Sequence, residues 1–471
     1  MDTTFRHDPR RIMQREHLWI HHEQDATCYW KIAEGGYPGR MSVKQGESVD
    51  FHISNSRAIY DIQVVREGTR RETVATLDNF RGEMHPVPDD GYRNGFDWPV
   101  TATLEIPLDW RSGIYIAQFP TGQGIREILF VVRPREPSAP MLLTLATNTY
   151  AAYNNVGGKS LYDYISTDRL RADQVSFERP LQPNVLGNFY FWDQFFTSWL
   201  DEEGIDVDYG INSDLDAEPD LLSKYRANLR VGHDEYNTRS ECKQLQRFVQ
   251  SGGNLLMFAG NCFFHDVEYR NDSRSMYCRK PHPNNPPTAE QPETDFWPYI
   301  ENMRQRTIGL MYTSFVHAKT DKPGVFHAQI TDDGRYGFFR VTDPDHWIYE
   351  STGLQAGDEF GREDSIVGVE ADAADIEFVD GKPVFTGVDG VSKQYRILAL
   401  AEAVIVNDCF LRMDGTGTGG EAEAFGVVSI NETEFAGTVF NAATIEWCHG
   451  LHREDSPVAT ITRNVLKRLG R

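Results

Sequence analysis

Residues 141–155, MLLTLATNTYAAYNN, begin with a short apolar run and continue into a series of polar side chains. A short apolar run of this kind is typical of a strand that is buried on both faces of a parallel sheet. Residues 227–236, ANLRVGHDEY, and residues 254–261, NLLMFAGN, repeat the arrangement. Because helical patterns separate these strands, the sequence predicts an α/β domain built on a parallel sheet.

Two segments between the predicted strands have helical periodicity. Residues 238–253, TRSECKQLQRFVQSGG, place their apolar residues on one face and end in glycines. Residues 189–204, FYFWDQFFTSWLDEEG, carry tryptophan and phenylalanine at helical spacing. This second helix has more aromatic residues than one face needs. The surplus indicates a second buried surface, either within the chain or against a second copy of it.

The N-terminal part of the chain is predicted to be β structure. In residues 41–54, MSVKQGESVDFHIS, apolar side chains recur with a period of two, and TATLEI, GIYIAQF and IREILFVV follow as further strands. Residues 133–140, RPREPSAP, contain three prolines and mark a boundary. We therefore predict a small Ig-like β-sandwich over residues 1–135 and the α/β domain over residues 141–471.

Composition excludes several classes of partner. The 471 residues include 47 Lys and Arg against 70 Asp and Glu, a net charge of −23, which argues against binding nucleic acid or an anionic membrane surface. No apolar run approaches the ~20 residues that span a bilayer, and the first residues contain no signal-like apolar segment. Six scattered cysteines are too few for a disulfide scaffold. These features predict a globular protein of the cytoplasm.

Polar residues that follow the three apolar strands are the first candidates for a site. In open parallel sheets, ligands bind beyond the carboxyl ends of the strands. Tyr153 follows the first strand, His233 and Glu235 follow the second, and Asn261 follows the third. Two structural alternatives remain open: the tyrosine can simply be a packing aromatic, and the residues around Asp234 can form the turn that caps the next helix.

Two further hypotheses for a functional site involve Cys262. Cys262-x2-His265 followed by Cys278-x3-His282 has the spacing of a zinc site. Cys262 also lies where a strand-to-helix turn can expose a nucleophile, as in cysteine amidotransferases. The sequence contains no G-x-S-x-G, G-x-x-x-x-G-K-[ST] or H-E-x-x-H motif.

Several longer motifs, taken in their order, resemble one known family. TNTYAAYNNVGGKSLYDY, DVDYGINSDLDAEPDLL, VGHDEYN and SGGNLLMFAGN are similar to the catalytic large subunit of N,N-dimethylformamidase, as are HWIYESTGLQAGDEFG, IVGVEAD, GTVFNAATIEWCHGL and the upstream WRSGIYIAQF. The resemblance implies a β-sandwich followed by an amidotransferase-like α/β domain. It also implies hydrolysis of the C–N bond of a small amide, with one mononuclear Fe(III) as the cofactor.

The resemblance also implies particular residues. The iron ligands would be Tyr115 of S-G-x-Y, Tyr153 of A-Y-N and Glu235 of G-H-D-E; the other catalytic groups would be His233, Asn261 and Glu370 of I-V-G-V-E. Two phenolates and a carboxylate are hard oxygen ligands that suit ferric iron. Such a metal polarises an amide carbonyl and lowers the pKa of bound water.

The chain departs from the family in places. It has no room for the family's lectin-like N-terminal domain, and Tyr150 and Asn237 stand where the family commonly has tryptophan. These two changes predict a more open, more polar pocket for larger amides. A homo-oligomer is the expected assembly, with the family's small companion subunit as a further partner. A non-catalytic binding protein, a redox iron site and a Cys262-dependent hydrolase are the alternative functions.

Overall fold

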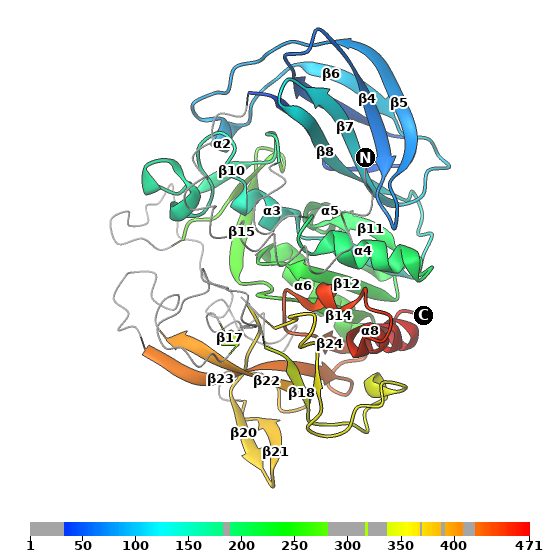
Figure 1. Cartoon of the computed structure of the whole chain (residues 1–471), viewed down its shortest axis with the longest axis vertical. Coiled ribbons are helices and arrows are strands. Elements are labelled where there is room, and N and C mark those ends of the chain that lie inside the picture. Colours follow the sequence, from blue (N-terminus) through cyan, green and yellow to red (C-terminus); the bar gives the residue numbers. More distant parts are fainter. Residues whose placement is uncertain are drawn as a thin grey trace.

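The computed structural model describes residues 33–181, 189–280, 316–318, 337–367, 370–387, 391–407 and 420–471. These residues form several sheets and are mostly β structure, with the N-terminal strands stacked above a large central sheet (Figure 1). None of the helices within these ranges is long and apolar enough to cross a membrane.

The N-terminal strands form two sheets that face each other. One sheet has the order β1-β3-β6 and the other β2-β8-β7-β4-β5. Their bounds are β1 Gly35–Pro38, β2 Ser42–Lys44, β3 Ser48–Ser54, β4 Ile59–Arg66, β5 Glu72–Arg81, β6 Val100–Glu105, β7 Gly113–Thr121 and β8 Gly124–Arg133. One apolar cluster, which includes Phe51, Ile62 and Phe130, draws side chains from both sheets. This two-layer arrangement is a β-sandwich.

The central sheet is mixed. Its order is β11-β9-β12-β14-β24-β23-β22-β18-β19, and β17 also pairs with β22. The strands are β9 Met141–Leu145, β11 Asp208–Ile211, β12 Ala227–His233, β14 Asn254–Gly260, β17 Val316–Ala318, β18 Phe339–Val341, β19 Glu359–Phe360, β22 Arg396–Asn407, β23 Gly420–Asn431 and β24 Val439–Asn441. From β11 to β24 all pairs are parallel, and from β24 onward they are antiparallel. The predicted parallel sheet is therefore one half of a larger sheet.

Two smaller sheets and several helices complete the described part of the fold. A four-stranded sheet contains β10 Gln174–Ser176, β16 Ser275–Tyr277, β15 His265–Arg270 and β13 Tyr236–Thr238, and a separate hairpin pairs β20 Ile376–Val379 with β21 Lys382–Phe385. The helices are α2 Gly91–Asn94, α3 Thr147–Tyr153, α4 Asp193–Glu202, α5 Asn212–Ala217, α6 Arg239–Gln250 and α8 Pro457–Leu469. Helix α6 begins as its sequence predicts, because the Thr238 hydroxyl accepts a hydrogen bond from the Glu241 amide at 3.1 Å.

Helix α4 lies between the β-sandwich and the central sheet (Figure 1). Its aromatic side chains Phe195, Phe196 and Trp199 are buried in one cluster with Ile114 of the sandwich and Phe258 of the central sheet. The second buried surface of this helix is thus covered by the chain itself. The aromatic surplus therefore gives no support to the predicted homo-oligomer.

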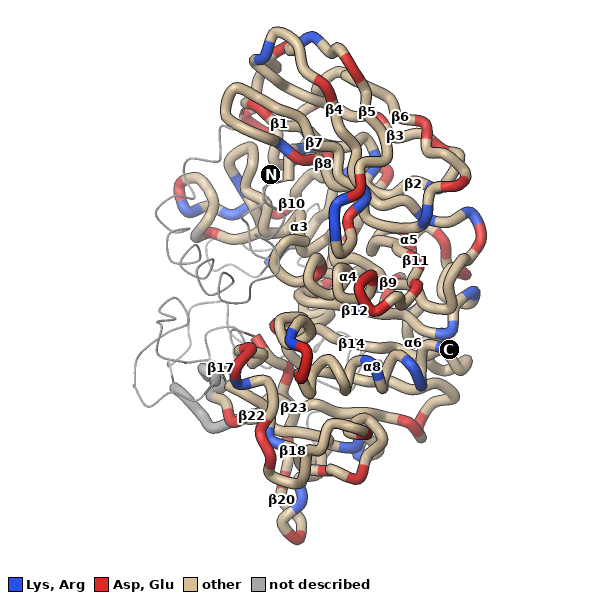
Figure 2. The backbone as a smooth tube through the Cα atoms, turned by 45° about the vertical axis from the view of Figure 1, so that its right-hand side comes forward, with Lys and Arg blue, Asp and Glu red and all other residues tan. Residues whose placement is uncertain are grey.

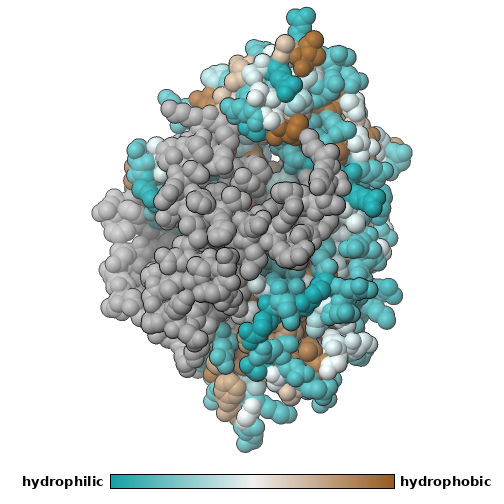
Figure 3. Space-filling view, in the orientation of Figure 1, coloured by the Kyte–Doolittle hydropathy of each residue, from teal (hydrophilic) through white to brown (hydrophobic). Residues whose placement is uncertain are grey.

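The surface of the described residues fits the acidic composition. Figure 2 shows the Lys and Arg positions scattered among Asp and Glu positions along the backbone. Figure 3 shows a largely hydrophilic face with isolated hydrophobic residues. Three of the exposed apolar residues, Phe378, Val379 and Val384, belong to the β20–β21 hairpin at the tip of the molecule.

Candidate active site

Neighbouring parallel strands bring the predicted polar residues to one edge of the central sheet. Strands β12 and β14 pair in a register that places His233 opposite Gly260, so Asn261 follows directly beside His233. The Asn261 Nδ2 lies 3.2 Å from the His233 Nε2. Helix α3 closes over the same edge, because the Thr149 hydroxyl accepts a hydrogen bond from the Glu235 amide at 3.0 Å. Tyr153, at the end of α3, therefore reaches Glu235.

Two phenols and one carboxylate form a compact group of oxygen atoms. The Tyr153 hydroxyl donates to Glu235 Oε2 at 3.0 Å, and the Tyr162 hydroxyl lies 2.9 and 2.8 Å from the two Glu235 oxygens. The two phenol oxygens are 2.7 Å apart, and the Tyr236 hydroxyl lies 2.8 Å from that of Tyr162. These five contacts exceed what three hydroxyl hydrogens can serve. The three tyrosine hydroxyls and the Glu235 carboxylate therefore form one cluster of closely spaced oxygen atoms.

An acid–base pair adjoins the oxygen group. The His233 Nε2 lies 2.8 Å from Glu370 Oε2 and 3.3 Å from Glu235 Oε2. Burial alone would lower the pKa of His233, but the Glu370 and Glu235 carboxylates outweigh it and raise that pKa to about 9. Asn261 Nδ2 also donates to Glu370 Oε2 at 3.2 Å. The two carboxylates on either side of His233 therefore favour the protonated form of its imidazole.

Cationic and aromatic groups close the other side. The Lys280 Nζ lies 3.6 Å from the centre of the Tyr162 ring and 5.2 Å from that of Tyr236. Burial lowers the pKa of Lys280 to about 8, against the attraction of Glu235. The His265 Nε2 lies 3.5 Å from Glu235 Oε1, and burial lowers the pKa of His265 well below its ordinary value.

Tyr115 does not belong to this group, so the structure does not bring it together with Tyr153 and Glu235, the other two predicted iron ligands. Side chains alternate between the two faces of a strand. On β7, Ile114 and Ile116 therefore face helix α4 and the central sheet, whereas Tyr115 points into the sandwich core. There its hydroxyl donates to the Arg111 carbonyl at 2.8 Å, and burial raises its pKa to about 12.

Tyr162, and not Tyr115, is the second tyrosine that contacts Glu235. It lies nine positions after Tyr153, inside the same quoted motif, TNTYAAYNNVGGKSLYDY. This second tyrosine, close in sequence to Tyr153, was the feature from which Tyr162 could have been predicted as a site residue. His265 was singled out only through the zinc-like spacing after Cys262, and Lys280 had no such signal, because the fold brings both in through β15 and β16.

The family model described as "N,N-dimethylformamidase beta subunit-like, C-terminal" matches residues 59–460, which is more than half of the chain. The chain belongs to this family. The family description names a beta subunit, so assignment to the catalytic large subunit stays a prediction. None of the curated proteins matches this sequence significantly.

Solved structures resemble this member of the dimethylformamidase beta-subunit-like family only distantly. A β-galactosidase from Bacillus circulans sp. alkalophilus is 12% identical, with a TM-score of 0.31 over 69% of this chain and 31% of that chain. The cold-adapted β-galactosidase from Rahnella sp. R3 is 11% identical, with a TM-score of 0.33 over 71% and 32%. The chain spans about a third of the length of each.

A glycine of the family-like motif G-H-D-E has a clear steric role. Gly232 has a φ of +65°, a conformation that favours glycine. A Cβ atom there would lie 2.4 Å from the Cβ of Trp192. The Trp192 ring in turn meets the His233 ring edge-on, with centroids 5.6 Å apart. Gly232 thus allows α4 to approach the strand that carries His233.

A buried ionic network lies under the site. Arg230, which is 0% exposed, holds Asp234 Oδ2 at 2.7 Å and Glu241 Oε1 at 2.8 Å. The Asn237 Nδ2 donates to Asp234 Oδ1 at 3.0 Å and to Glu241 Oε2 at 3.3 Å. The network fixes the segment that contains His233 and Glu235. Asn237, which is fully buried, thus belongs to this network.

The buried carboxyl of Asp193, beside Tyr150, should make the free energy of unfolding depend on pH. Burial raises the pKa of this carboxyl from 3.8 to about 8, with the Tyr150 hydroxyl acting in the opposite direction. Folding then takes up a proton, so the free energy of unfolding falls as pH rises between about 4 and 8. Relative to Asp193→Asn, we expect the wild type to lose about 1.4 kcal/mol per pH unit. Urea unfolding at pH 5.5, 6.5 and 7.5 measures this difference. Equal pH slopes would contradict it, and Asp455→Asn, at an exposed position, is the control.

The cysteine alternatives find no support in the geometry. Cys262 is buried in an apolar cluster with Met257 and Val427, where its thiol is not presented as an exposed nucleophile. His265 contacts Glu235, and His282 lies outside the described residues. Within those residues no group of three His, Cys, Asp or Glu side chains is arranged to hold a metal ion. Tyr153, Tyr162 and Glu235 do not count as such a group, because two of these three side chains are tyrosines.

Proposed function

We propose that this chain is an amide hydrolase that cleaves the C–N bond of a small N-substituted amide. Membership of the dimethylformamidase beta-subunit-like family supports a hydrolase of this class. The observation that carries the proposal is the oxygen group, in which Tyr162 lies within 2.9 Å of both Glu235 oxygens and 2.7 Å from Tyr153. We further propose that the chain corresponds to the catalytic large subunit and that its parallel strands form an amidotransferase-like sheet.

The donor set fits one ferric ion. Tyr153, Tyr162 and Glu235 offer two phenolates and a carboxylate, which are hard anionic ligands. Their oxygens converge although they have too few hydrogens to satisfy their mutual contacts, and a cation among them would relieve this. Ferric iron bound there would supply a Lewis acid for the amide carbonyl and would acidify water.

Neighbouring residues can transfer a proton and stabilise the charge that develops during the reaction. His233 carries a proton on Nε2 at neutral pH and can pass it to the departing amine nitrogen, while Glu370 orients the ring and stabilises its charge. Asn261 presents Nδ2 at the same place, where it can donate to the oxygen that becomes negative as the amide carbon turns tetrahedral. Because these side chains are buried, bulk water is excluded from the exchange.

Substitution of His233 or Asn261 should lower the rate of catalysis without loss of the metal. We expect His233→Ala and Asn261→Ala to lower kcat about 10²-fold or more while the iron content stays near wild type. Steady-state kinetics with a size-graded panel of amides and elemental analysis of the same samples provide the two readouts. His346→Ala, which removes a buried histidine bound to Glu432, is the control. Near-wild-type kcat in either variant would refute that residue's role, and a wild-type protein that binds amides without turnover would favour the binding-protein alternative.

Assembly and location remain predictions. We propose a homo-oligomer, with a small companion subunit as a second partner, in the cytoplasm. The mass of the purified chain in solution, measured together with its activity, tests the first part.

A further inference from the structure

Tyr236 adjoins the oxygen group, and the proposed function assigns no role to it. Its hydroxyl lies 2.8 Å from the Tyr162 hydroxyl. It directly follows Glu235 in the sequence, and it is fully buried. A buried phenol hydroxyl usually finds a hydrogen-bond partner, and here that partner is a proposed iron ligand.

The direction of this hydrogen bond follows from the other contacts of Tyr162. The Tyr162 oxygen lies 2.9 and 2.8 Å from the two Glu235 oxygens and 2.7 Å from the Tyr153 oxygen. Tyr162 has a single hydroxyl hydrogen, and a carboxylate is a stronger acceptor than a phenol. Tyr236 therefore donates in the contact of 2.8 Å, and Tyr162 accepts. As a phenolate on a metal, Tyr162 would carry no hydrogen and would remain the acceptor.

Several contacts fix the position of Tyr236. Its ring stacks on the His265 ring, with centroids 4.9 Å apart and planes 24° from parallel. Strands β13 and β15 pair in a register that sets Tyr236 opposite His265. The Asn148 Nδ2 donates to the Tyr236 carbonyl at 3.1 Å. These contacts hold both the ring and the backbone, so the hydroxyl is placed at Tyr162 before any metal binds.

We propose that Tyr236 is a positioning residue that tunes the ferric site through Tyr162. Its hydroxyl donates to the Tyr162 phenolate oxygen and withdraws negative charge from it, which leaves the ferric ion a stronger Lewis acid. A hydrogen bond to an ionised acceptor is about twice as strong as one between neutral groups, so a single donor has a measurable effect. This inference rests on the proposed ferric site and does not depend on which amide is the substrate.

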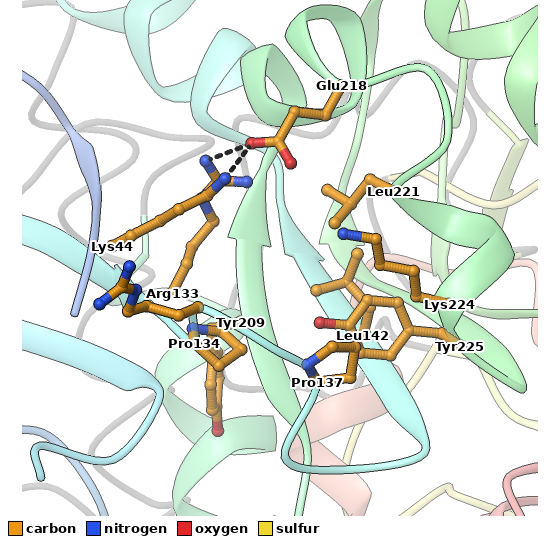
Figure 4. Close-up of a pocket in the computed structure, with 11 residues that line it drawn as sticks. Lys44, Arg133, Pro134, Pro137, Leu142, Tyr209, Glu218, Leu221, Lys224 and Tyr225 are labelled. Carbon is orange, nitrogen blue, oxygen red and sulfur yellow. Dashed lines mark hydrogen bonds and ion pairs between the residues drawn. The ribbon is translucent and has the colours of Figure 1, made fainter. Parts of the chain in front are cut away.

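Tyr225 provides the matched control. Its hydroxyl also donates to an acidic partner, Asp208, at 3.1 Å. Figure 4 shows the Tyr225 side chain beside Leu142, which lies near the start of β9. Tyr225 precedes β12, whereas His233 ends that strand, so Tyr225 lies at the opposite end of β12 from the oxygen group.

Absorption spectroscopy of the whole protein loaded with ferric iron tests the proposal. Tyr236→Phe keeps the stacked ring and removes only the donor. We expect its iron content to equal that of the wild type and its phenolate-to-iron absorption band to move to longer wavelength, because a phenolate without this hydrogen bond gives up an electron more easily. With the best amide of a size-graded panel, kcat should fall about tenfold or more with little change in KM. Tyr225→Phe should leave the band, the iron content and kcat unchanged.

A second measurement uses the wild type and does not depend on how well a variant folds. Resonance Raman spectra excited in the same band report the C–O stretch of each phenolate ligand. Equilibration of the protein in D2O should shift one of these stretches in the wild type and in Tyr225→Phe. The shift should be lost in Tyr236→Phe, because the exchangeable hydrogen on Tyr162 is then missing.

The outcomes separate this inference from the proposed amidase activity. An unchanged band in Tyr236→Phe, or no effect of D2O on the wild type, would overturn the role of Tyr236. Loss of iron from Tyr236→Phe would also overturn it, because Tyr236 would then be needed to hold the metal. A wild type that binds no ferric iron would refute both the ferric site and its tuning. A wild type that shows the expected band shifts but hydrolyses no amide would refute the amidase proposal alone.

Discussion

Replacing Tyr162 by phenylalanine should abolish iron binding and lower amidase activity by about 10³-fold or more. The ring remains in place, packed against the Tyr153 ring and under Lys280, but the oxygen within 2.9 Å of Glu235 is lost. A neutral ring cannot replace a phenolate ligand, and loss of a ligand that holds a catalytic metal removes the Lewis acid from the reaction. Elemental analysis and the visible absorption of ferric phenolate report the metal separately from activity.

Tyr115→Phe is the matched control for this substitution. It removes a buried tyrosine hydroxyl whose partner is the Arg111 carbonyl within the sandwich. The Tyr115 variant should therefore keep its iron, its colour and its activity. If Tyr115→Phe lost the metal while Tyr162→Phe kept it, the assignment of ligands would be reversed. If active wild-type protein contained zinc or no metal, the ferric proposal itself would fail.

Replacing Arg230 by methionine should destabilise the protein by about 3–5 kcal/mol, because it leaves buried carboxylates without their partner. Arg230 forms ion pairs with both Asp234 and Glu241, and all three side chains are buried. Urea unfolding followed by circular dichroism measures the loss. The exposed Arg226→Met, four residues earlier, should change the free energy of unfolding by less than about 0.5 kcal/mol.

A compensated variant distinguishes a charge effect from a packing effect. Arg230→Met combined with Asp234→Asn and Glu241→Gln removes the unpaired charges, so part of the lost stability should return. The iron content of both the single and the triple variant should be lower than that of the wild type, because Asp234 no longer anchors the segment between His233 and Glu235. Full recovery of both stability and iron would show that the network has no positioning role.

The strand ends were predictable from sequence because they depend on local patterns. Apolar runs followed by polar residues located Tyr153, His233 and Asn261, and parallel pairing brings these positions to one edge of the sheet. Tyr115 could not be judged in the same way. Its motif gives the residue type, but its orientation depends on which face of β7 packs against α4.

The remaining site residues depend on long-range folding. Lys280 approaches Tyr162 only because β10, β16, β15 and β13 build a small sheet beside the main one. No period or spacing in the sequence encodes that pairing. In the same way, the antiparallel half of the central sheet is completed by strands after residue 316, and no local pattern encodes the direction in which these strands pair.

The position of helix α4 restricts how the β-sandwich and the α/β part can move relative to each other. Its two faces are as well packed as a protein interior, one against the sandwich and the other against the sheet. The Gln194 side chain adds a bond of 3.0 Å to Glu67, and the Thr69 hydroxyl bonds to Asp201 at 3.0 Å. An interface of this kind resists hinge rotation. The sandwich and the α/β part should therefore move as one rigid body, and access to the buried oxygen group must come from local rearrangement of side chains and loops.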